Sequence, residues 1–155
     1  MKTLLRTSAA ISALLCSSLT AFAADWTGPY VGAYYAFGID GIGSDFAGIQ
    51  AGYNFAGSGN LIFGVEADYG WATNGAGEIW ALSGRIAAEV APDLLLFGSV
   101  GYGEATPATS FTTGAIGMQY AITPAFALRA SVDGYWPTGG GTTATAGKLG
   151  VLYSF

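Results

Sequence analysis

The chain lacks histidine altogether, which removes the side chain that enzymes most often use to move protons. Ser83, Ser99 and Ser131 therefore have no imidazole to act as their base. Cysteine is almost absent as well, so the commonest ligands of zinc and related metals are missing and only carboxylates are left. We therefore expect no catalytic residue, no metal site and no cofactor, and we do not expect an enzyme.

Basic residues, and charged residues in general, are also scarce in this chain. Charged residues make up 10% of the chain, whereas soluble domains carry about 25%. Five basic residues stand against ten acidic ones. Two of the five, Lys2 and Arg6, fall in the first residues, so the rest of the chain has three bases, ten acids and a formal net charge of −7. Nucleic-acid phosphates require a basic surface, which excludes nucleic acid as a partner.

The first 23 residues have the pattern of a secretory signal peptide. Lys2 and Arg6 give a positive start, residues 11–19 give a short apolar run, and a small-x-small sequence ends at Ala23. This run is too short for a membrane-spanning helix, which needs about 20 residues. Cleavage is predicted between Ala23 and Ala24.

The only cysteine, Cys16, lies within this leader. Leu15 precedes it, whereas a lipoprotein signal has a small residue at that place, so Cys16 is interpreted as an inert leader residue. The sequence therefore predicts a signal peptide over residues 1–23 and one domain over residues 24–155. That domain has no cysteine and is held together without disulfides.

Long apolar runs are missing beyond the leader, although 52% of the chain is hydrophobic. The last eleven residues explain how both statements hold. One face carries Thr145, Gly147, Leu149, Val151, Tyr153 and Phe155, and the other face is small or polar apart from Leu152. Period two is the pattern of a β-strand. In a soluble β-sandwich the apolar face could be buried, but Lys148 on the other face would have to reach water. A strand with lipid on its apolar side and a polar lumen on the other accommodates both faces.

The same alternation recurs along the chain and predicts eight strands. They are expected at residues 29–38, 47–55, 61–71, 80–90, 94–102, 114–122, 126–136 and 145–155. Tight turns follow Phe55, Val90 and Ile122, and longer connections follow the other strands, one of them a loop over residues 104–113. The predicted fold is all-β, an eight-stranded antiparallel transmembrane β-barrel, because closure leaves no strand edge in lipid. With both termini on one side, the tight turns are periplasmic and the loops extracellular.

Aromatic residues support this assignment independently. On outward positions near the tight turns lie Tyr53, Phe55, Tyr120, Phe126, Tyr153 and Phe155, and near the loops lie Phe37, Tyr69, Trp71, Trp80, Tyr102 and Trp136. Aromatics favour strands in general, but that preference does not explain two clusters on one face. Two aromatic bands are typical of a membrane barrel.

A set of charged residues falls on the inward face. It comprises Glu66, Asp68, Arg85, Glu89, Arg129, Asp133 and Lys148. Counting along the strands places Arg85 level with Glu66 and Asp68, and Lys148 near Asp133. An eight-stranded barrel is just wide enough for side chains to fill, so a plug of ion pairs is the first interpretation. The alternatives are a polar path for ions or small solutes, and acid–base chemistry by the two carboxylates on residues 61–71.

Two weaker patterns concern the loops. Asp40 and Asp45 could hold a weak Ca²⁺, although acidic loop residues are usually only solvated. The glycine clusters at residues 38–43 and 139–141 have neither the lysine nor the strand–loop–helix setting of a phosphate-binding loop, so they indicate turns.

Three segments carry a family resemblance over the whole mature chain: residues 26–32 (WTGPYVG), the hairpin 114–135 with Thr123-Pro124 at its turn, and the ending Tyr153-Ser154-Phe155. They resemble the small outer-membrane β-barrel family with an OmpA-like barrel, which includes opacity-type proteins and the 25- and 31-kDa outer-membrane proteins of alphaproteobacteria. The resemblance implies the Gram-negative outer membrane, with lipid and lipopolysaccharide as surroundings. It also implies insertion by the outer-membrane barrel assembly machinery, which would read Leu149, Val151, Tyr153 and Phe155.

We expect a structural or surface-interaction role with a salt-bridged, mostly plugged lumen. The alternative is a narrow passive channel for ions or small polar solutes, and an enzyme acting on lipopolysaccharide ranks third. The short loops argue against an adhesin-like role, and the sequence identifies no extracellular partner.

Overall fold

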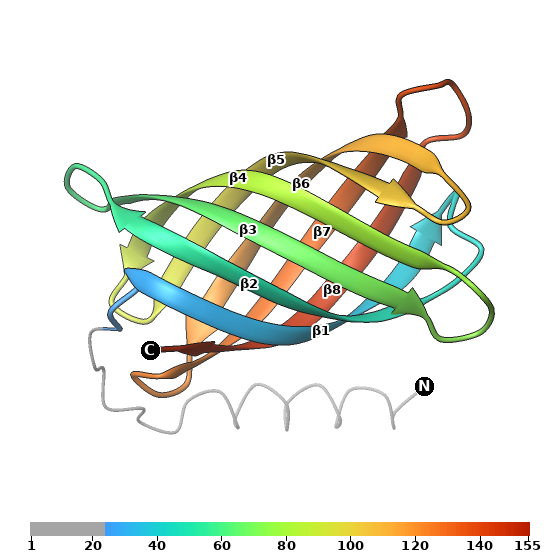
Figure 1. Cartoon of the computed structure of the whole chain (residues 1–155). Coiled ribbons are helices and arrows are strands. Elements are labelled where there is room, and N and C mark those ends of the chain that lie inside the picture. Colours follow the sequence, from blue (N-terminus) through green and yellow to red (C-terminus); the bar gives the residue numbers. More distant parts are fainter. Residues whose placement is uncertain (1–23) are drawn as a thin grey trace, which may run out of the picture.

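The computed structural model describes residues 24–155 as eight antiparallel strands, each paired with the next (Figure 1). The predicted signal peptide, Cys16 and the residue before the cleavage point, Ala23, lie outside the described residues. The strands are β1 (Gly28–Asp40), β2 (Phe46–Ala56), β3 (Leu61–Ala72), β4 (Glu78–Ala91), β5 (Leu94–Ala105), β6 (Thr109–Ala121), β7 (Phe126–Pro137) and β8 (Ala144–Ser154). In this part of the chain, no helix is long and apolar enough to cross a membrane.

Pairing between the first and last strands closes the sheet into a barrel. β1 lies against β2 on one side and against β8 on the other, where Val31 is opposite Tyr153. Each strand has 11 to 14 residues, which is enough to span the apolar core of a membrane at the usual tilt of barrel strands. The predicted all-β, eight-stranded antiparallel barrel is therefore confirmed.

The two ends of the barrel differ in their connections. Three short turns (residues 57–60, 92–93 and 122–125) lie at the end where residues 24–27 and the C-terminus also lie, which we call the turn end. The connections 41–45, 73–77, 106–108 and 138–143 lie at the opposite end, which we call the loop end. The short turns are the connections that the sequence predicts on the periplasmic side.

The predicted loop over residues 104–113 is wrong. β5 continues to Ala105 and β6 begins at Thr109, so the connection has only three residues. Ser, Thr and Pro in this stretch masked an alternation that places Phe111 and Thr113 inward, where both are buried. The ring of Phe111 lies against Gly103 on the neighbouring strand, which extends the hairpin beyond the predicted boundary.

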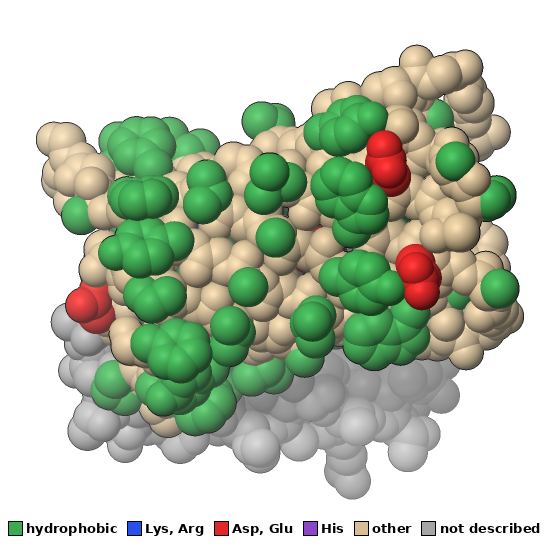
Figure 2. Space-filling view, in the orientation of Figure 1, with side chains coloured by type: hydrophobic (Ala, Val, Ile, Leu, Met, Phe, Trp, Pro, Cys, Tyr) green, Lys and Arg blue, Asp and Glu red, His purple; other side chains and the backbone are tan. Residues whose placement is uncertain are grey.

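The outward face of the barrel is apolar, as the alternation predicted. The side chains of Leu82, Val100 and Ile116 are 60%, 71% and 72% exposed near the middle of their strands. Large hydrophobic side chains gather in a band near each end of the barrel, and smaller ones lie between the bands (Figure 2). Of the twelve predicted band residues all but Tyr120, which is half-buried, are exposed. An apolar belt between aromatic bands is what a lipid bilayer covers.

Large rings fill the inward face because glycines lie opposite them. The directly paired residues are Tyr30 and Gly52, Tyr34 and Gly48, Phe97 and Gly117, and Phe111 and Gly103. A Cβ built at any of these four glycines would meet the facing ring. Each ring therefore occupies the space that a side chain at the facing glycine would fill, and Tyr30, Tyr34 and Phe97 also contact charged groups.

Candidate functional site

Six charged side chains meet in the middle of the lumen, on strands β3, β4, β7 and β8. They form two groups of three, which we call the Glu66 triad (Glu66, Arg85, Arg129) and the Lys148 triad (Lys148, Asp68, Asp133). The Glu66 triad has a formal net charge of +1 and the Lys148 triad of −1, so the interior set is neutral. On β3 and β7, the member of the Lys148 triad lies closer to the loop end than the member of the Glu66 triad on the same strand. Lys148 itself lies in the loop-end half of β8.

In the Glu66 triad, two guanidinium groups share one carboxylate. Arg129 Nη1 donates to Glu66 Oε2, and Arg85 Nη1 lies 3.8 Å from the same oxygen. Tyr30 from β1 donates its hydroxyl proton to Glu66 Oε2 at 2.6 Å and accepts a hydrogen bond from Arg85 Nη1 at 3.1 Å. Both guanidinium groups lie against the ring of Phe97, with Arg85 Cζ 4.7 Å and Arg129 Cζ 4.3 Å from its centre. Two like charges thus share one carboxylate and the face of an aromatic ring, both of which favour a cation.

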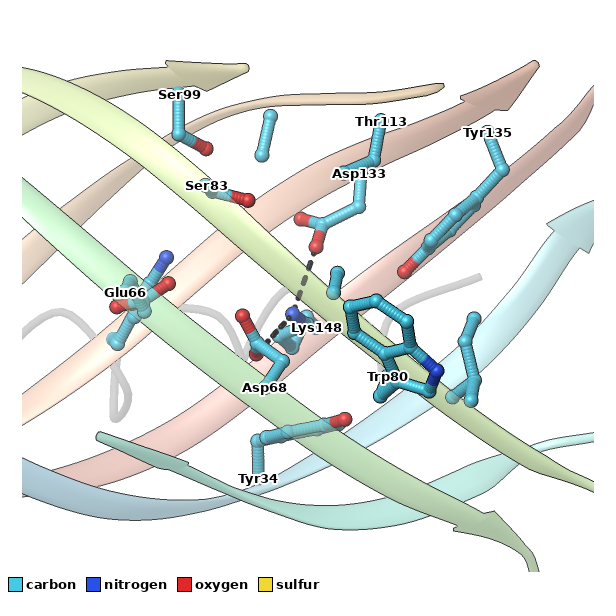
Figure 3. Close-up of a pocket in the computed structure, with 14 residues that line it drawn as sticks. Tyr34, Glu66, Asp68, Trp80, Ser83, Ser99, Thr113, Asp133, Tyr135 and Lys148 are labelled. Atoms are coloured by element: carbon cyan, nitrogen blue, oxygen red, sulfur yellow. Dashed lines mark hydrogen bonds and ion pairs between the residues drawn. The ribbon is translucent and has the colours of Figure 1, made fainter. Parts of the chain in front are cut away.

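In the Lys148 triad, one ammonium group bridges two carboxylates (Figure 3). Lys148 Nζ lies 3.0 Å from Asp68 Oδ1 and 2.9 Å from Asp133 Oδ2. Ser131 donates its hydroxyl proton to the other oxygen of Asp133 at 2.6 Å. The ammonium also lies 4.5 Å from the ring centre of Tyr34. Buried carboxylates of like charge stay ionised only when a cation neutralises them, and this geometry supplies that cation.

The charged layer leaves little room for solvent. The cavity between the two triads is about 30 Å³, and a second one of about 20 Å³ lies toward the loop end beside Tyr34 and Tyr135. A buried water needs roughly 10–15 Å³, so these spaces hold about two waters and about one water. The charged side chains themselves are almost fully buried: Arg85 is 1% exposed and Asp68, the most accessible of the six, is 11% exposed.

Six of the seven charged residues predicted on the inward face come together, but one expected pairing is wrong. Asp68 was expected beside Arg85, and its partner is Lys148 from the far side of the lumen. Among residues 24–155, Glu89 forms no ion pair; it lies half-buried at the turn end and lines a hollow beside Ala24 and Asp25. The expected proximity of Lys148 and Asp133 is present in the structure.

Several residues that contact the charged groups were not assigned to the site from the sequence. Tyr30, Phe97, Gln119 and Ser131 all contact the charged groups, and Gln119 Oε1 accepts a hydrogen bond from Arg85 Nη2 at 3.3 Å. The first strand was the hardest to orient because both of its faces carry tyrosines. The glycines opposite Tyr30 and Phe97 are the signal that could have shown that these rings fill the lumen.

The remaining predicted residues lie outside the lumen. The side chains of Leu149, Val151, Tyr153 and Phe155 all point outward and are exposed. Asp45 organises the first loop, where it accepts hydrogen bonds from the Tyr35 hydroxyl at 2.8 Å and from the backbone N–H of Gly38 at 3.2 Å. Gly41 and Gly140 adopt positive φ angles of 69° and 83°, in keeping with turns. In the region that the structure describes, no group of three His, Cys, Asp or Glu side chains is placed to hold a metal ion.

Solved structures of transmembrane barrels resemble this fold. The N-terminal β-barrel domain of Pseudomonas aeruginosa OprF is 17% identical with a TM-score of 0.64, and the match covers 82% of this chain and 96% of that one. A de novo designed transmembrane β-barrel is 20% identical with a TM-score of 0.63 (86% and 100% covered). Ail of Yersinia pestis, solved in complex with the heparin analogue sucrose octasulfate, is 13% identical with a TM-score of 0.57 (83% and 97% covered). At these identities the likeness shows the fold alone.

The comparison with protein families goes further. No curated protein matches the chain. The family model described as "Outer membrane protein beta-barrel domain" matches residues 8–155, nearly the whole chain. Together with the apolar belt, the aromatic bands and the closed eight-stranded barrel, this match places the protein in the Gram-negative outer membrane. The chain belongs to the outer membrane protein β-barrel domain family.

Proposed function

We propose that this protein has a structural and surface-interaction role in the outer membrane and that its own side chains close its lumen. The observation that carries the proposal is the pairing of all six interior charges, each of them 11% exposed or less. A neutral, tightly paired set fills the barrel at mid-height. The spaces left beside it accommodate only a few waters.

The distribution of charge also limits the partners that we propose. All three basic residues of the mature chain lie in the lumen, so the seven remaining acids, Asp25, Asp40, Asp45, Glu78, Glu89, Asp93 and Glu104, face no basic side chain outside it. A sulfated polyanion such as the one bound to Ail would meet no basic side chain on this surface. We propose instead that the aromatic bands contact phospholipid and lipopolysaccharide.

We propose no catalysis in the lumen, including the modification of lipopolysaccharide. Glu66 and Asp68 are each held by a cation, and no residue of the chain is a histidine that could exchange protons with them. We also propose that residues 1–23 are removed during export. The outward residues Leu149, Val151, Tyr153 and Phe155 then serve as the signal that the barrel assembly machinery reads.

A narrow channel is the second candidate, and one observation favours it. Several buried polar atoms in the lumen have no hydrogen-bond partner within residues 24–155: both amide atoms of Gln50, Gln119 Nε2, Arg85 Nε and Arg129 Nε. Such atoms are normally satisfied by protein or water. A file of waters past the Glu66 triad would satisfy them and would also provide a path for small ions.

Conductance in planar bilayers separates the two candidates. We would compare the wild type with Arg85→Ala/Arg129→Ala, which empties the centre of the lumen. The matched control is Ile86→Ala/Leu128→Ala, which truncates the adjacent outward residues of the same two strands. Heat-modifiable migration of each protein on a gel reports correct folding.

The closed lumen predicts no steps in the wild type and in the control, and discrete steps in the arginine double variant. Discrete steps in the wild type that the arginine substitutions alter would contradict it and make the channel the leading function. Silence in all three folded proteins would show that the arginines alone do not close the lumen, which would contradict this assignment of the plug.

A further inference from the structure

We propose that residues 24–27 form a stopper that closes the turn end of the lumen, with Trp26 as its seal. The inference deepens the closed lumen proposed above by assigning a second barrier, separate from the charged layer and apolar in character.

Two hydrogen bonds hold the backbone of the stopper against the barrel mouth, one to a side chain of a strand and one to the backbone of a turn. Asn54 Nδ2 on β2 donates to the carbonyl oxygen of Trp26 at 2.7 Å. The backbone N–H of Ala24 donates to the carbonyl oxygen of Pro92, in the turn between β4 and β5, at 3.1 Å. The first contact lies on β2 and the second lies two strands further around the barrel, so the segment spans the opening.

The segment also has its own fold. Asp25 Oδ1 accepts hydrogen bonds from the backbone N–H of Thr27 at 3.0 Å and from its hydroxyl group at 2.6 Å. This local turn leaves Asp25 exposed and Thr27 half-buried and directs the residue between them inward. Trp26 is accordingly only 7% exposed.

Trp26 completes an apolar cluster that fills the turn end of the lumen. The other members are Tyr30, Ile62, Ala87, Leu95, Phe97, Ala121, Ala127 and Leu152, contributed by seven of the eight strands, with Ala24 packed against them. Leu95 is completely buried. An apolar constriction resists the passage of ions because water does not wet it. The stopper and the charged layer therefore exclude solutes for different physical reasons.

The seal depends on the apolar surface of the indole and not on its polar group. Within the described chain, Trp26 Nε1 has no hydrogen-bond partner. An unpaired buried N–H is unfavourable, so the smaller phenyl ring of phenylalanine, which has no such group, should keep most of the seal. This expectation distinguishes a seal from a specific hydrogen-bonding role.

The stopper differs from the strands in how it is attached. The strands are fixed by continuous ladders of hydrogen bonds to both neighbours, whereas residues 24–27 have the few contacts described above. Segments with few backbone contacts open at lower free energy than the strands they rest on. The turn end is therefore the end of the lumen that can open without unfolding the barrel.

A cysteine reporter tests this directly in the full chain expressed in a Gram-negative host. In a Cys16→Ser background, Ala121→Cys places one thiol in the cluster at the turn end of β6, where the wild-type alanine is 4% exposed. We would measure the rate of its reaction with a charged, water-soluble maleimide in isolated outer membranes. The variants are Trp26→Ala, Trp26→Phe and, as a matched control, Trp136→Ala, which removes an outward tryptophan at the loop end.

The stopper predicts a slow reaction with Trp26 or with Trp26→Phe and a rate roughly tenfold or more higher with Trp26→Ala. An unchanged rate with Trp26→Ala, or an equal increase with Trp136→Ala, would overturn the proposal. If Trp26→Ala does not fold, as judged by heat-modifiable migration, Asn54→Ala replaces it because it removes the hydrogen bond to the Trp26 carbonyl. The same increase in labelling rate is then expected, and an unchanged rate would overturn the proposal. The thiol lies on the turn-end side of the charged layer, so its labelling reports the stopper whether or not that layer conducts.

Discussion

The outward and inward faces of the same eight strands are built by different rules. On the outward face, each side chain meets lipid, so any apolar residue of moderate size is acceptable and the contacts between neighbours matter little. On the inward face, each side chain meets particular partners: Glu66 meets two arginines and a tyrosine, and the Phe97 ring contacts both guanidinium groups. The surrounding lipid determines which residues suit the outward face, whereas close packing between side chains determines which residues suit the inward face.

The difference shows in how tolerant the two faces should be. A substitution that keeps the outward face apolar changes little, whereas one that alters the shape or charge of the inward face leaves a group without its partner. The predictions below test this contrast, beginning with the largest expected effect.

The strongest contrast should come from Lys148, which neutralises two buried carboxylates. Lys148→Ala leaves Asp68 and Asp133 facing each other in the lumen, and we expect the free energy of unfolding to fall by about 3–5 kcal/mol. Urea unfolding of the refolded protein in detergent micelles measures the change. The outward neighbour substitution Leu149→Ala is the matched control and should cost much less.

A compensating variant tells whether the loss comes from unpaired charge. Adding Asp68→Asn and Asp133→Asn to Lys148→Ala should restore most of the stability, because the two remaining amides carry no charge. A Lys148→Ala midpoint equal to that of the wild type would show that the Lys148 triad does not stabilise the barrel.

A charge placed on the outward face tests the lipid-facing assignment. Ile116 is 72% exposed in the middle of β6, and Ile116→Arg should lower the free energy of unfolding in bilayers by about 2–4 kcal/mol. Thr112→Arg adds the same charge on the same face nearer the loop end, where the cost should fall to about 0–1 kcal/mol. Equal costs at the two positions would contradict the membrane placement.

Two glycines offer a smaller but closely matched comparison of the faces. A Cβ at Gly52, on the inward face, would meet the Tyr30 ring and the backbone carbonyl of Val65, whereas a Cβ at Gly84, on the outward face, would meet nothing within 4 Å. Gly52→Ala should therefore cost about 1–3 kcal/mol through overpacking, and Gly84→Ala should be nearly neutral or slightly stabilising. If the two variants had the same urea midpoint, this would contradict the argument that Gly52 makes room for the Tyr30 ring.

The sequence was sufficient to predict the features that depend on the alternation of outward and inward residues along a strand. It predicted the number of strands, which residues point outward and which charges point inward, because lipid and lumen impose opposite requirements on alternate residues. It failed at residues 104–113, where Ser and Thr lie on both faces of a strand that continues beyond the apolar belt. Hydroxyl side chains suit a strand and a loop equally well, so alternation there carried no signal.

The pairing within the lumen could be predicted only in part, for a geometrical reason. Counting along adjacent strands identifies neighbours in the sheet, which found Lys148 beside Asp133 on the next strand. Asp68 pairs with the same lysine across the lumen, with β1 and β2 lying between their strands, and such contacts depend on the closure and tilt of the barrel. The contact between Tyr30 and Glu66 could not be predicted either, because the Tyr30 ring fits into the lumen only with Gly52 opposite it.

The measurement that tests the closed lumen most directly combines the two barriers. We would record bilayer conductance for the wild type, Trp26→Ala, Arg85→Ala/Arg129→Ala and the triple variant, each shown to be folded by its heat-modifiable migration. Because the stopper opens more easily than the charged layer, the account predicts a silent wild type, a silent Trp26→Ala variant, brief steps in Arg85→Ala/Arg129→Ala and the largest and longest steps in the triple variant. Discrete steps in the wild type, as large as those of the triple variant, would contradict the account.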